Sequence, residues 1–149
     1  MTTGHSNLKS ILIRRLRDAL RPYGFKHRGI CYTLHDGDVT KFLSVCTWPR
    51  LGPNELRFTL DISVTSEALV AYSPEFLFKG VHYGHAPIHE RIGWMSHYQR
   101  DVWWDVSSVE ECESVVLEIM SAFKESIWPY LASIRSNTDL AKALRHPPR

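Results

Sequence analysis

The sequence predicts an α+β fold, in which a single antiparallel sheet is packed on one face by an N-terminal helix and a long C-terminal helix. Two stretches, residues 7–21 and 108–134, repeat apolar side chains at helical spacing. Between them, residues 55–64 alternate apolar and polar side chains, which is typical of a strand with one buried and one wet face. Because parallel sheets buried on both sides have continuous apolar strands instead, this alternation favours an antiparallel sheet.

The N-terminal helix is predicted over residues 7–21. Pro22 and Gly24 supply the residues that commonly end a helix. The apolar stripe that would face the core consists of Leu8, Leu12, Leu16, Ala19 and Leu20. The opposite side carries a basic patch, which consists of Arg14, Arg17 and Arg21. This helix is therefore expected to present a basic face to solvent.

A hairpin should follow the first helix. Residues 29–35 and 39–48 are rich in β-branched and aromatic side chains, and the segment 36–38, Asp-Gly-Asp, signals a turn between them. The alternating strand over residues 55–64 comes next. Its wet face should carry Arg57, Thr59 and Asp61.

The region after this strand is less regular. Prolines and glycines interrupt residues 66–87, which we interpret as a long connection or an insertion. Residues 88–95 and 102–106 are short strand candidates.

The C-terminal helix begins with a capping box, since Ser108 is followed three residues later by Glu111. Pro129 removes one helical hydrogen bond and should interrupt the helix near residues 126–128. The polar segment 137–149 ends in two prolines and an arginine, and we expect it to be frayed.

Composition and length limit the class of protein. With 149 residues, 44% of them hydrophobic and 23% charged, residues 1–149 are expected to form one globular domain. The chain has no run of about 18 apolar residues, so no membrane association is predicted. The three cysteines form no C-x-x-C pair, which fits reduced, structural thiols and a cytoplasmic location.

The most varied chemistry lies between residues 89 and 105, where three of the five tryptophans occur. Arg91 beside aromatic rings could clamp a carboxylate or a phosphate. In the alternative interpretation the tryptophans complete the core and Arg91 pairs with Glu90 or Asp105. The candidate binding residues are His89, Glu90, Arg91, Trp94, Trp103, Trp104 and Asp105.

The histidines of this region are candidate metal ligands. His82, His85, His89 and His97 are the densest group of potential ligands, but Gly84 and Pro87 lie between them and the spacing matches no known metal pattern. Hydrogen-bonded or surface histidines are therefore favoured over a zinc site. The chain carries no nucleotide-binding or calcium-binding motif either, and no cofactor is predicted.

The charge is unevenly distributed along the chain. Residues 1–30 contain seven lysines and arginines and one acidic residue, although the net charge of the whole chain is only +2. Such a basic patch could bind an acidic protein surface or a nucleic acid. The same features describe an ordinary solvated helix face, and the near-neutral net charge favours that interpretation.

A family resemblance rests on residues 19–29, A-L-R-P-Y-G-F-K-H-R-G, on the later Arg91-Ile92-Gly93-Trp94, and on Trp103-Trp104. With these segments the chain resembles a bacterial family catalogued as domain of unknown function 4304. The similarity runs from about Leu8 to Leu131 and is poor over residues 66–87. The resemblance implies a compact α+β bacterial domain and supplies no catalytic residue.

Three hypotheses for function follow. The first is a small intracellular protein-binding or regulatory module that uses the basic patch or the tryptophan-rich segment. The second is a small enzyme, in which the histidine, glutamate, arginine and tryptophans of residues 89–105 line a pocket for an anionic small molecule. The third is a weak nucleic-acid binder. The sequence leaves the oligomeric state open.

Overall fold

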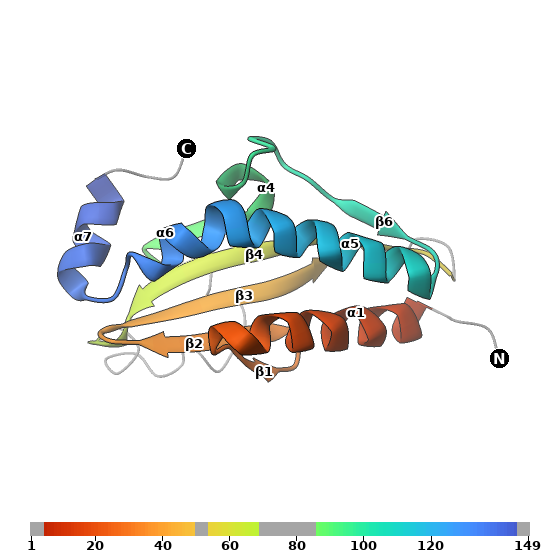
Figure 1. Ribbon diagram of the computed structural model, residues 1–149, viewed down its shortest axis with the longest axis horizontal. Coiled ribbons are helices and arrows are strands. Elements are labelled where there is room, and N and C mark those ends of the chain that lie inside the picture. The colour runs from red at the N-terminus through yellow and green to blue at the C-terminus, as the bar shows by residue number, and fades with distance from the viewer. Residues whose placement is uncertain (1–4, 50–53, 69–85, 146–149) are drawn as a thin grey trace.

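The computed structural model describes residues 5–49, 54–68 and 86–145 (Figure 1). It consists of one antiparallel sheet with two long helices side by side over the same face, which confirms the predicted fold class. The strands are β1 (Lys26–Arg28), β2 (Cys31–Asp36), β3 (Val39–Thr47), β4 (Leu56–Ser66), β5 (Ile88–Arg91) and β6 (Trp104–Val106). They follow the order β1-β2-β3-β4-β5 in the sheet. The short strand β6 also pairs with β4, along residues 56–58, whereas β5 pairs with residues 61–64 of β4.

The sheet register decides which side chains meet. Every recorded strand pairing is antiparallel, and on β4 Asp61 lies opposite Arg91 of β5, while Arg57 lies opposite Asp105 of β6. On the other side of β4, Thr59 lies opposite Cys46 of β3. Because alternate residues of a strand share a face, these side chains all point away from the helices.

Helix α1 (His5–Leu20) begins two residues earlier than predicted and ends one residue earlier, at Leu20. A 3-10 turn over Arg21–Tyr23 follows it, and Gly24 caps that turn with a left-handed φ of 96°. Four leucines at helical spacing, Leu8, Leu12, Leu16 and Leu20, are completely or almost completely buried. They anchor α1 firmly on the sheet and leave its other side in solvent.

The second long helix is interrupted just before Pro129, as the sequence predicts. Helix α5 (Val109–Ala122) passes through a π-helical turn (Phe123–Ile127) into α6 (Trp128–Ala132). Proline donates no backbone hydrogen bond, and the wider turn before it accommodates that loss. At the start of α5, the Ser108 hydroxyl accepts a hydrogen bond from the Glu111 backbone N–H at 3.1 Å, which confirms the predicted cap.

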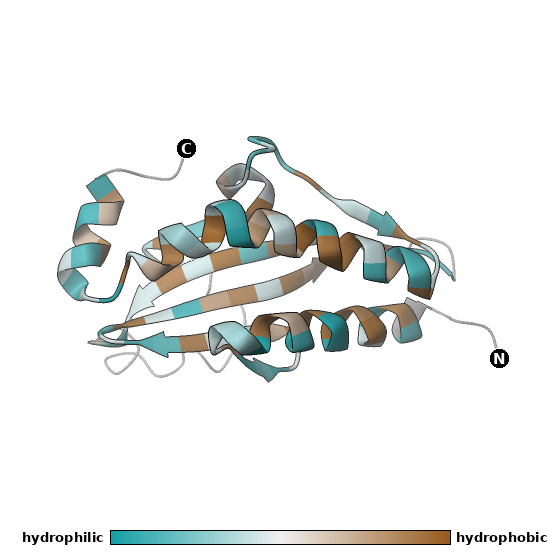
Figure 2. Cartoon of the chain, viewed as in Figure 1, coloured by the Kyte–Doolittle hydropathy of each residue, from teal (hydrophilic) through white to brown (hydrophobic). Residues whose placement is uncertain are grey.

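The hydrophobic core lies between the sheet and the two helices. Figure 2 shows hydrophobic residues on β3 and β4 beneath the helices, alternating with polar ones along each strand. Leu43, Leu60 and Ile62 of the sheet and Ile119 of α5 are buried in one continuous cluster with the α1 leucines. Burial of this apolar surface is the main stabilising contribution to the fold.

The prediction of a wet face on β4 is wrong for most of its length. Thr59 is completely buried, and its hydroxyl donates to the Val102 carbonyl at 2.8 Å, which satisfies the hydroxyl away from water. Ser63 is buried as well. Only Arg57 and Asp61 of this face keep part of their side chains exposed, at 38% and 17%.

The predicted strand over residues 88–95 is also too long. Strand β5 ends at Arg91, and residues Ile92–Met95 form the short helix α4. The reason lies in a close approach of two backbones, since a Cβ atom on Gly93 would come within 2.1 Å of the Arg100 carbonyl oxygen. Strand β6 covers only residues 104–106 of the predicted 102–106.

The tail predicted to fray is helical instead, as α7 (Asn137–Arg145). Leu140 of α7 is 5% exposed and belongs to the core cluster, so tertiary packing stabilises a segment whose composition is mostly polar. Of the predicted connection 66–87, residues 69–85 lie outside the described part of the chain, as do residues 146–149 of the tail.

Candidate functional site

The seven candidate binding residues do not share one face of the sheet. His89 and Arg91 of β5 point away from the helices, whereas Glu90 lies opposite Ile62 on the helix-covered face. Trp104 is only 7% exposed, and its ring lies 5.9 Å from that of Phe58 in the core. The structure therefore brings part of the set together and assigns Trp104 to packing, as the alternative interpretation expected.

Arg91 is already surrounded by carboxylates. Its guanidinium donates to Asp101 at 2.7 Å, and its Nε lies 3.7 Å from Asp61. The guanidinium carbon also lies 5.0 Å from the centre of the Trp103 ring, in a cation–π contact. These partners differ from the predicted Glu90 and Asp105, because the fold places Asp101 and Asp61 nearer.

A second arginine is held in the same way. Arg57 forms two hydrogen bonds with Asp105, at 2.7 and 3.3 Å, and its guanidinium lies 5.8 Å from the Trp48 ring. The Trp48 and Trp103 rings meet edge to face, with their centres 5.4 Å apart. We call this group the tryptophan–arginine cluster; it consists of Trp48, Arg57, Arg91, Asp101, Trp103 and Asp105.

Three members of this cluster, Trp48, Arg57 and Asp101, were not among the binding residues predicted from the sequence. Trp48 follows β3, and Arg57 lies on β4, whereas the other members come from the region of β5 and β6. The strand register brings them together, and no local sequence pattern contains that information. Arg57 and Asp105 also line a surface hollow of about 270 Å³ with Glu55, Val106, Ser107 and Glu111.

The remaining candidates, His89 and Trp94, are not members of this cluster. The Nδ1 atom of His89, whose side chain is exposed, lies 2.8 Å from the Ser63 hydroxyl, and Trp94 is half-buried on α4. No group of three or more potential ligands within residues 5–49, 54–68 and 86–145 could hold a metal ion. His82 and His85 lie outside the described residues.

Cys46, which contacts Asp61 beside Arg91, is not a reactive thiol. The Cys46 thiol donates to Asp61 at 2.9 Å, and burial together with that carboxylate raises the pKa of Cys46 to about 12. The thiol is therefore protonated at neutral pH, and the thiolate that would act as a nucleophile is not formed. Burial also raises the pKa of the Cys112 thiol.

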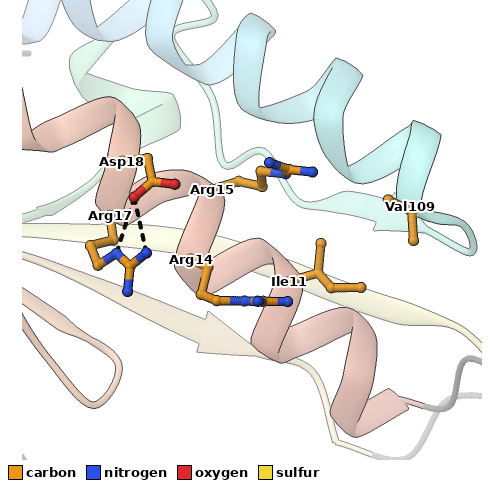
Figure 3. A pocket seen from close by; sticks show the side chains of 6 residues that line it. All are labelled: Ile11, Arg14, Arg15, Arg17, Asp18 and Val109. Atoms are coloured by element: carbon orange, nitrogen blue, oxygen red, sulfur yellow. Dashed lines mark hydrogen bonds and ion pairs between the residues drawn. The ribbon is translucent and has the colours of Figure 1, made fainter.

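The basic patch of α1 faces solvent at one side of the molecule. Arg14 and Arg21 are exposed and Arg17 is half-buried. A hollow of about 250 Å³ opens here, lined by Ile11, Arg14, Arg15, Arg17, Asp18 and Val109 (Figure 3). Arg15, which the predicted patch omits, contributes a further guanidinium to this hollow.

The arginines of the hollow differ in how far they are neutralised. Arg17 contacts Asp18 at 3.1 Å, as Figure 3 shows, and Arg15 pairs with Glu113 of α5 at 2.8 Å. Arg21 lies 3.8 Å from the same Asp18, so that one carboxylate serves two arginines. No ion pair recorded within the described residues engages Arg14. The hollow therefore keeps a positive charge that its own carboxylates do not balance.

These features define a small α+β domain with a basic helix face on one side and a tryptophan–arginine cluster on the face of the sheet away from the helices. Among the described residues, no helix is both long and apolar enough to cross a membrane. Residues 16–133 match the family model described as Domain of unknown function (DUF4304), and the chain belongs to this family. No curated protein and no solved structure matches the chain. The family description names no activity.

Proposed function

We propose that this domain is a protein-binding module whose α1 surface binds an acidic region of a partner protein. The observation that carries the proposal is the hollow of Figure 3, where three guanidiniums and a single carboxylate line the same concave surface. Opposite charge on a partner would be attracted over distances near the Debye length, about 8–10 Å at physiological salt.

The packing of helix α1, which carries these arginines, supports the same proposal. The α1 leucines are buried, so the helix is held in place and its outward side chains keep their positions. Ile11 and Val109 add apolar atoms to the hollow, which would contact the aliphatic part of a glutamate or aspartate side chain. Arginine is suited to this task because its planar guanidinium binds a carboxylate with two parallel hydrogen bonds.

An enzymatic role draws less support from the described residues. The proposed anion clamp, Arg91, is already neutralised by Asp101 and Asp61. Cys46, the thiol beside it, is held protonated. His89 contacts Ser63, and Glu90 lies on the opposite face of the sheet. The catalytic groups that the second hypothesis needs would have to converge, and these do not.

The test compares binding by the wild type with binding by a variant that carries Arg14→Gln, Arg17→Gln and Arg21→Gln. Partners captured from the native host would be identified, produced separately and titrated by calorimetry. We expect an acidic partner whose dissociation constant rises about threefold to a hundredfold in the variant, since exposed ion pairs contribute about 0.2–1 kcal/mol each. For the wild type, affinity should also fall steeply with salt.

A matched control makes the same change of charge elsewhere. Arg100, Lys124 and Lys142 are exposed on other elements, and replacing all three by glutamine should leave partner binding unchanged. Equal binding by the wild type and the α1 variant would refute the proposal. Retention of the wild type on DNA or RNA, lost in the α1 variant, would refute it in favour of nucleic-acid binding.

A further inference from the structure

The tryptophan–arginine cluster is a second surface, separate from α1, and its chemistry fits another copy of the same chain. We infer that the protein forms a symmetric dimer in which this cluster packs against itself. The inference does not depend on the function proposed for α1, because the two surfaces share no residue. It rests on the exposure, the rigidity and the charge of the cluster.

Exposure is unusual for the aromatic residue at the centre of the cluster. Trp48 is 47% exposed although it is one of the largest apolar side chains, and the neighbouring Pro49 is exposed as well. A tryptophan buries about 150–250 Å² when it is fully covered. Tryptophan and arginine are also the residue types that most often dominate the binding energy of protein interfaces. Covering Trp48 would therefore be favourable.

The cluster is held in one arrangement before any partner binds. Asp105 fixes Arg57 through two hydrogen bonds, and Asp101 accepts from Arg91 at 2.7 Å. The Trp103 indole N–H also donates to Asp101, at 3.2 Å. Because these side chains are already ordered, association would cost little of the side-chain entropy that usually opposes binding.

The charge of the cluster indicates that its binding partner is a second copy of the chain. In a two-fold dimer the same patch lies on both sides of the interface, so a patch with an excess of one sign repels its own copy. The exposed ion pairs of the cluster contain two arginines and two aspartates, Arg57 with Asp105 and Arg91 with Asp101, whereas Asp61, the other neighbour of Arg91, is only 17% exposed. Two copies can therefore meet without net repulsion, and each arginine can face an aspartate of the other copy. The α1 surface, with its excess of arginine, does not allow this.

The test is sedimentation velocity of the untagged full chain from micromolar to millimolar concentration. We expect the wild type to change from monomer to dimer over this range, with the summed tryptophan fluorescence shifting to shorter wavelength as the Trp48 ring leaves water. Trp48→Glu should raise the dissociation constant at least thirtyfold, which is the effect of losing a dominant interface residue, about 2 kcal/mol or more. A milder Trp48→Ala variant should weaken the dimer in the same direction.

The matched control is Leu117→Glu, which places the same charge at a side chain 73% exposed on α5 and should leave the dimer intact. Circular dichroism would check that each variant is folded. A wild type that stays monomeric up to millimolar concentration would overturn the inference, as would a dimer that survives Trp48→Glu. The α1 glutamine variant should dimerise like the wild type, so the failure of one proposal would be distinguishable from the failure of the other.

Discussion

At the scale of single residues, Lys41 is the most consequential side chain inside the fold. It lies on the helix-covered face of β3 and is completely buried. Its Nζ donates to Asp36 at 2.8 Å and lies 5.9 Å from the centre of the Trp128 ring. The other oxygen of Asp36 accepts from Arg135 at 3.1 Å. A buried ammonium needs such partners, because an unpaired charge in the interior is very costly.

We predict that Asp36→Asn lowers the free energy of unfolding by about 3 kcal/mol at neutral pH, since it leaves the Lys41 charge buried without its counter-ion. Urea denaturation would measure the change. Asp38 on the same turn is exposed and accepts one hydrogen bond, from the Asn137 backbone N–H at 3.3 Å. Asp38→Asn should therefore cost no more than about 1 kcal/mol. Equal losses in the two variants would contradict this account of Lys41.

The ion pair between Lys41 and Asp36 also predicts that the free energy of unfolding depends on pH. The hydrogen bond from Lys41 lowers the pKa of Asp36 below its ordinary value of 3.8, despite the opposing effect of burial. A carboxyl whose pKa is lower in the folded state stabilises the fold above its unfolded pKa, and this contribution is lost as pH falls through the folded pKa. Below about pH 4 the wild type should therefore lose stability more steeply than Asp36→Asn, which lacks this titration. Parallel denaturation curves for the two proteins from neutral to acidic pH would show it.

At the scale of elements, the sequence predicted what local periodicity determines. The stripe of α1, the presence of strand β4 and the Ser108 cap of α5 each depend on residues within one element, and the structure confirms all three. Pro129 likewise acts on its own helix. These features follow from backbone geometry, which every stretch of sequence carries with it.

Elements that depend on distant contacts were predicted less well. The strand predicted over 88–95 gives way to α4 because the backbone of Arg100 returns against Gly93. On the polar face of β4, Thr59 is buried and its hydroxyl donates to the Val102 carbonyl, far along the chain. Helix α7 forms because Leu140 is buried in the hydrophobic core. In each case the deciding partner lies elsewhere in the chain, so tertiary packing overrides the local pattern.

The turn between β2 and β3 offers a test of one such contact. Gly37 has a left-handed φ of 62°, and a Cβ atom there would lie 2.0 Å from the Arg135 carbonyl oxygen. That carbonyl accepts a hydrogen bond from the Asp38 backbone N–H at 3.0 Å. The tip of the hairpin therefore lies directly against the backbone that leads into α7.

We predict that Gly37→Ala lowers the free energy of unfolding by about 2–4 kcal/mol, because backbone strain adds to a steric clash with Arg135. Gly29 is the matched control. Its φ is 61°, and a Cβ atom there would meet nothing within 4 Å. Gly29→Ala should therefore cost only the strain, about 1 kcal/mol. If chemical denaturation gave the same loss for both alanines, the close approach of the hairpin to Arg135 would be refuted.

At the scale of the whole molecule, the candidate surfaces were predictable in unequal degree. The basic patch follows from one helix, so the sequence located Arg14, Arg17 and Arg21 on the outer face correctly. The tryptophan–arginine cluster combines side chains from β4, β5 and the segments beside β3 and β6, so its membership depends on the sheet register. The sequence identified the segment with the richest chemistry and missed the partners that neutralise Arg91.

Helix α7 lies outside residues 16–133, the part of the chain that matches the family model. In Figure 1 it projects from one end of the molecule, away from the layer formed by α1 and α5. Its buried residue is Leu140, whereas Leu144, one turn later, is 47% exposed. The buried residue that α7 contributes to the core cluster is Leu140, and the other buried members come from elsewhere in the chain, so we expect α7 to be an addition to the core.

We predict that Leu140→Ala lowers the free energy of unfolding by about 2–3 kcal/mol, since it removes a buried leucine and leaves a cavity between α7 and the core. Leu144→Ala, one turn later in the same helix where the side chain is 47% exposed, should change stability by less than about 0.5 kcal/mol. A chain that ends at Ser136 should still fold, with a loss of stability similar to that of Leu140→Ala, because Leu140 provides most of the packing of α7. Thermal and urea denaturation would measure all three proteins, and hydrogen exchange would show whether the amides of β3 and β4 stay protected without α7. Loss of that protection in the shortened chain would mean that α7 is part of the folding unit and not an addition to it.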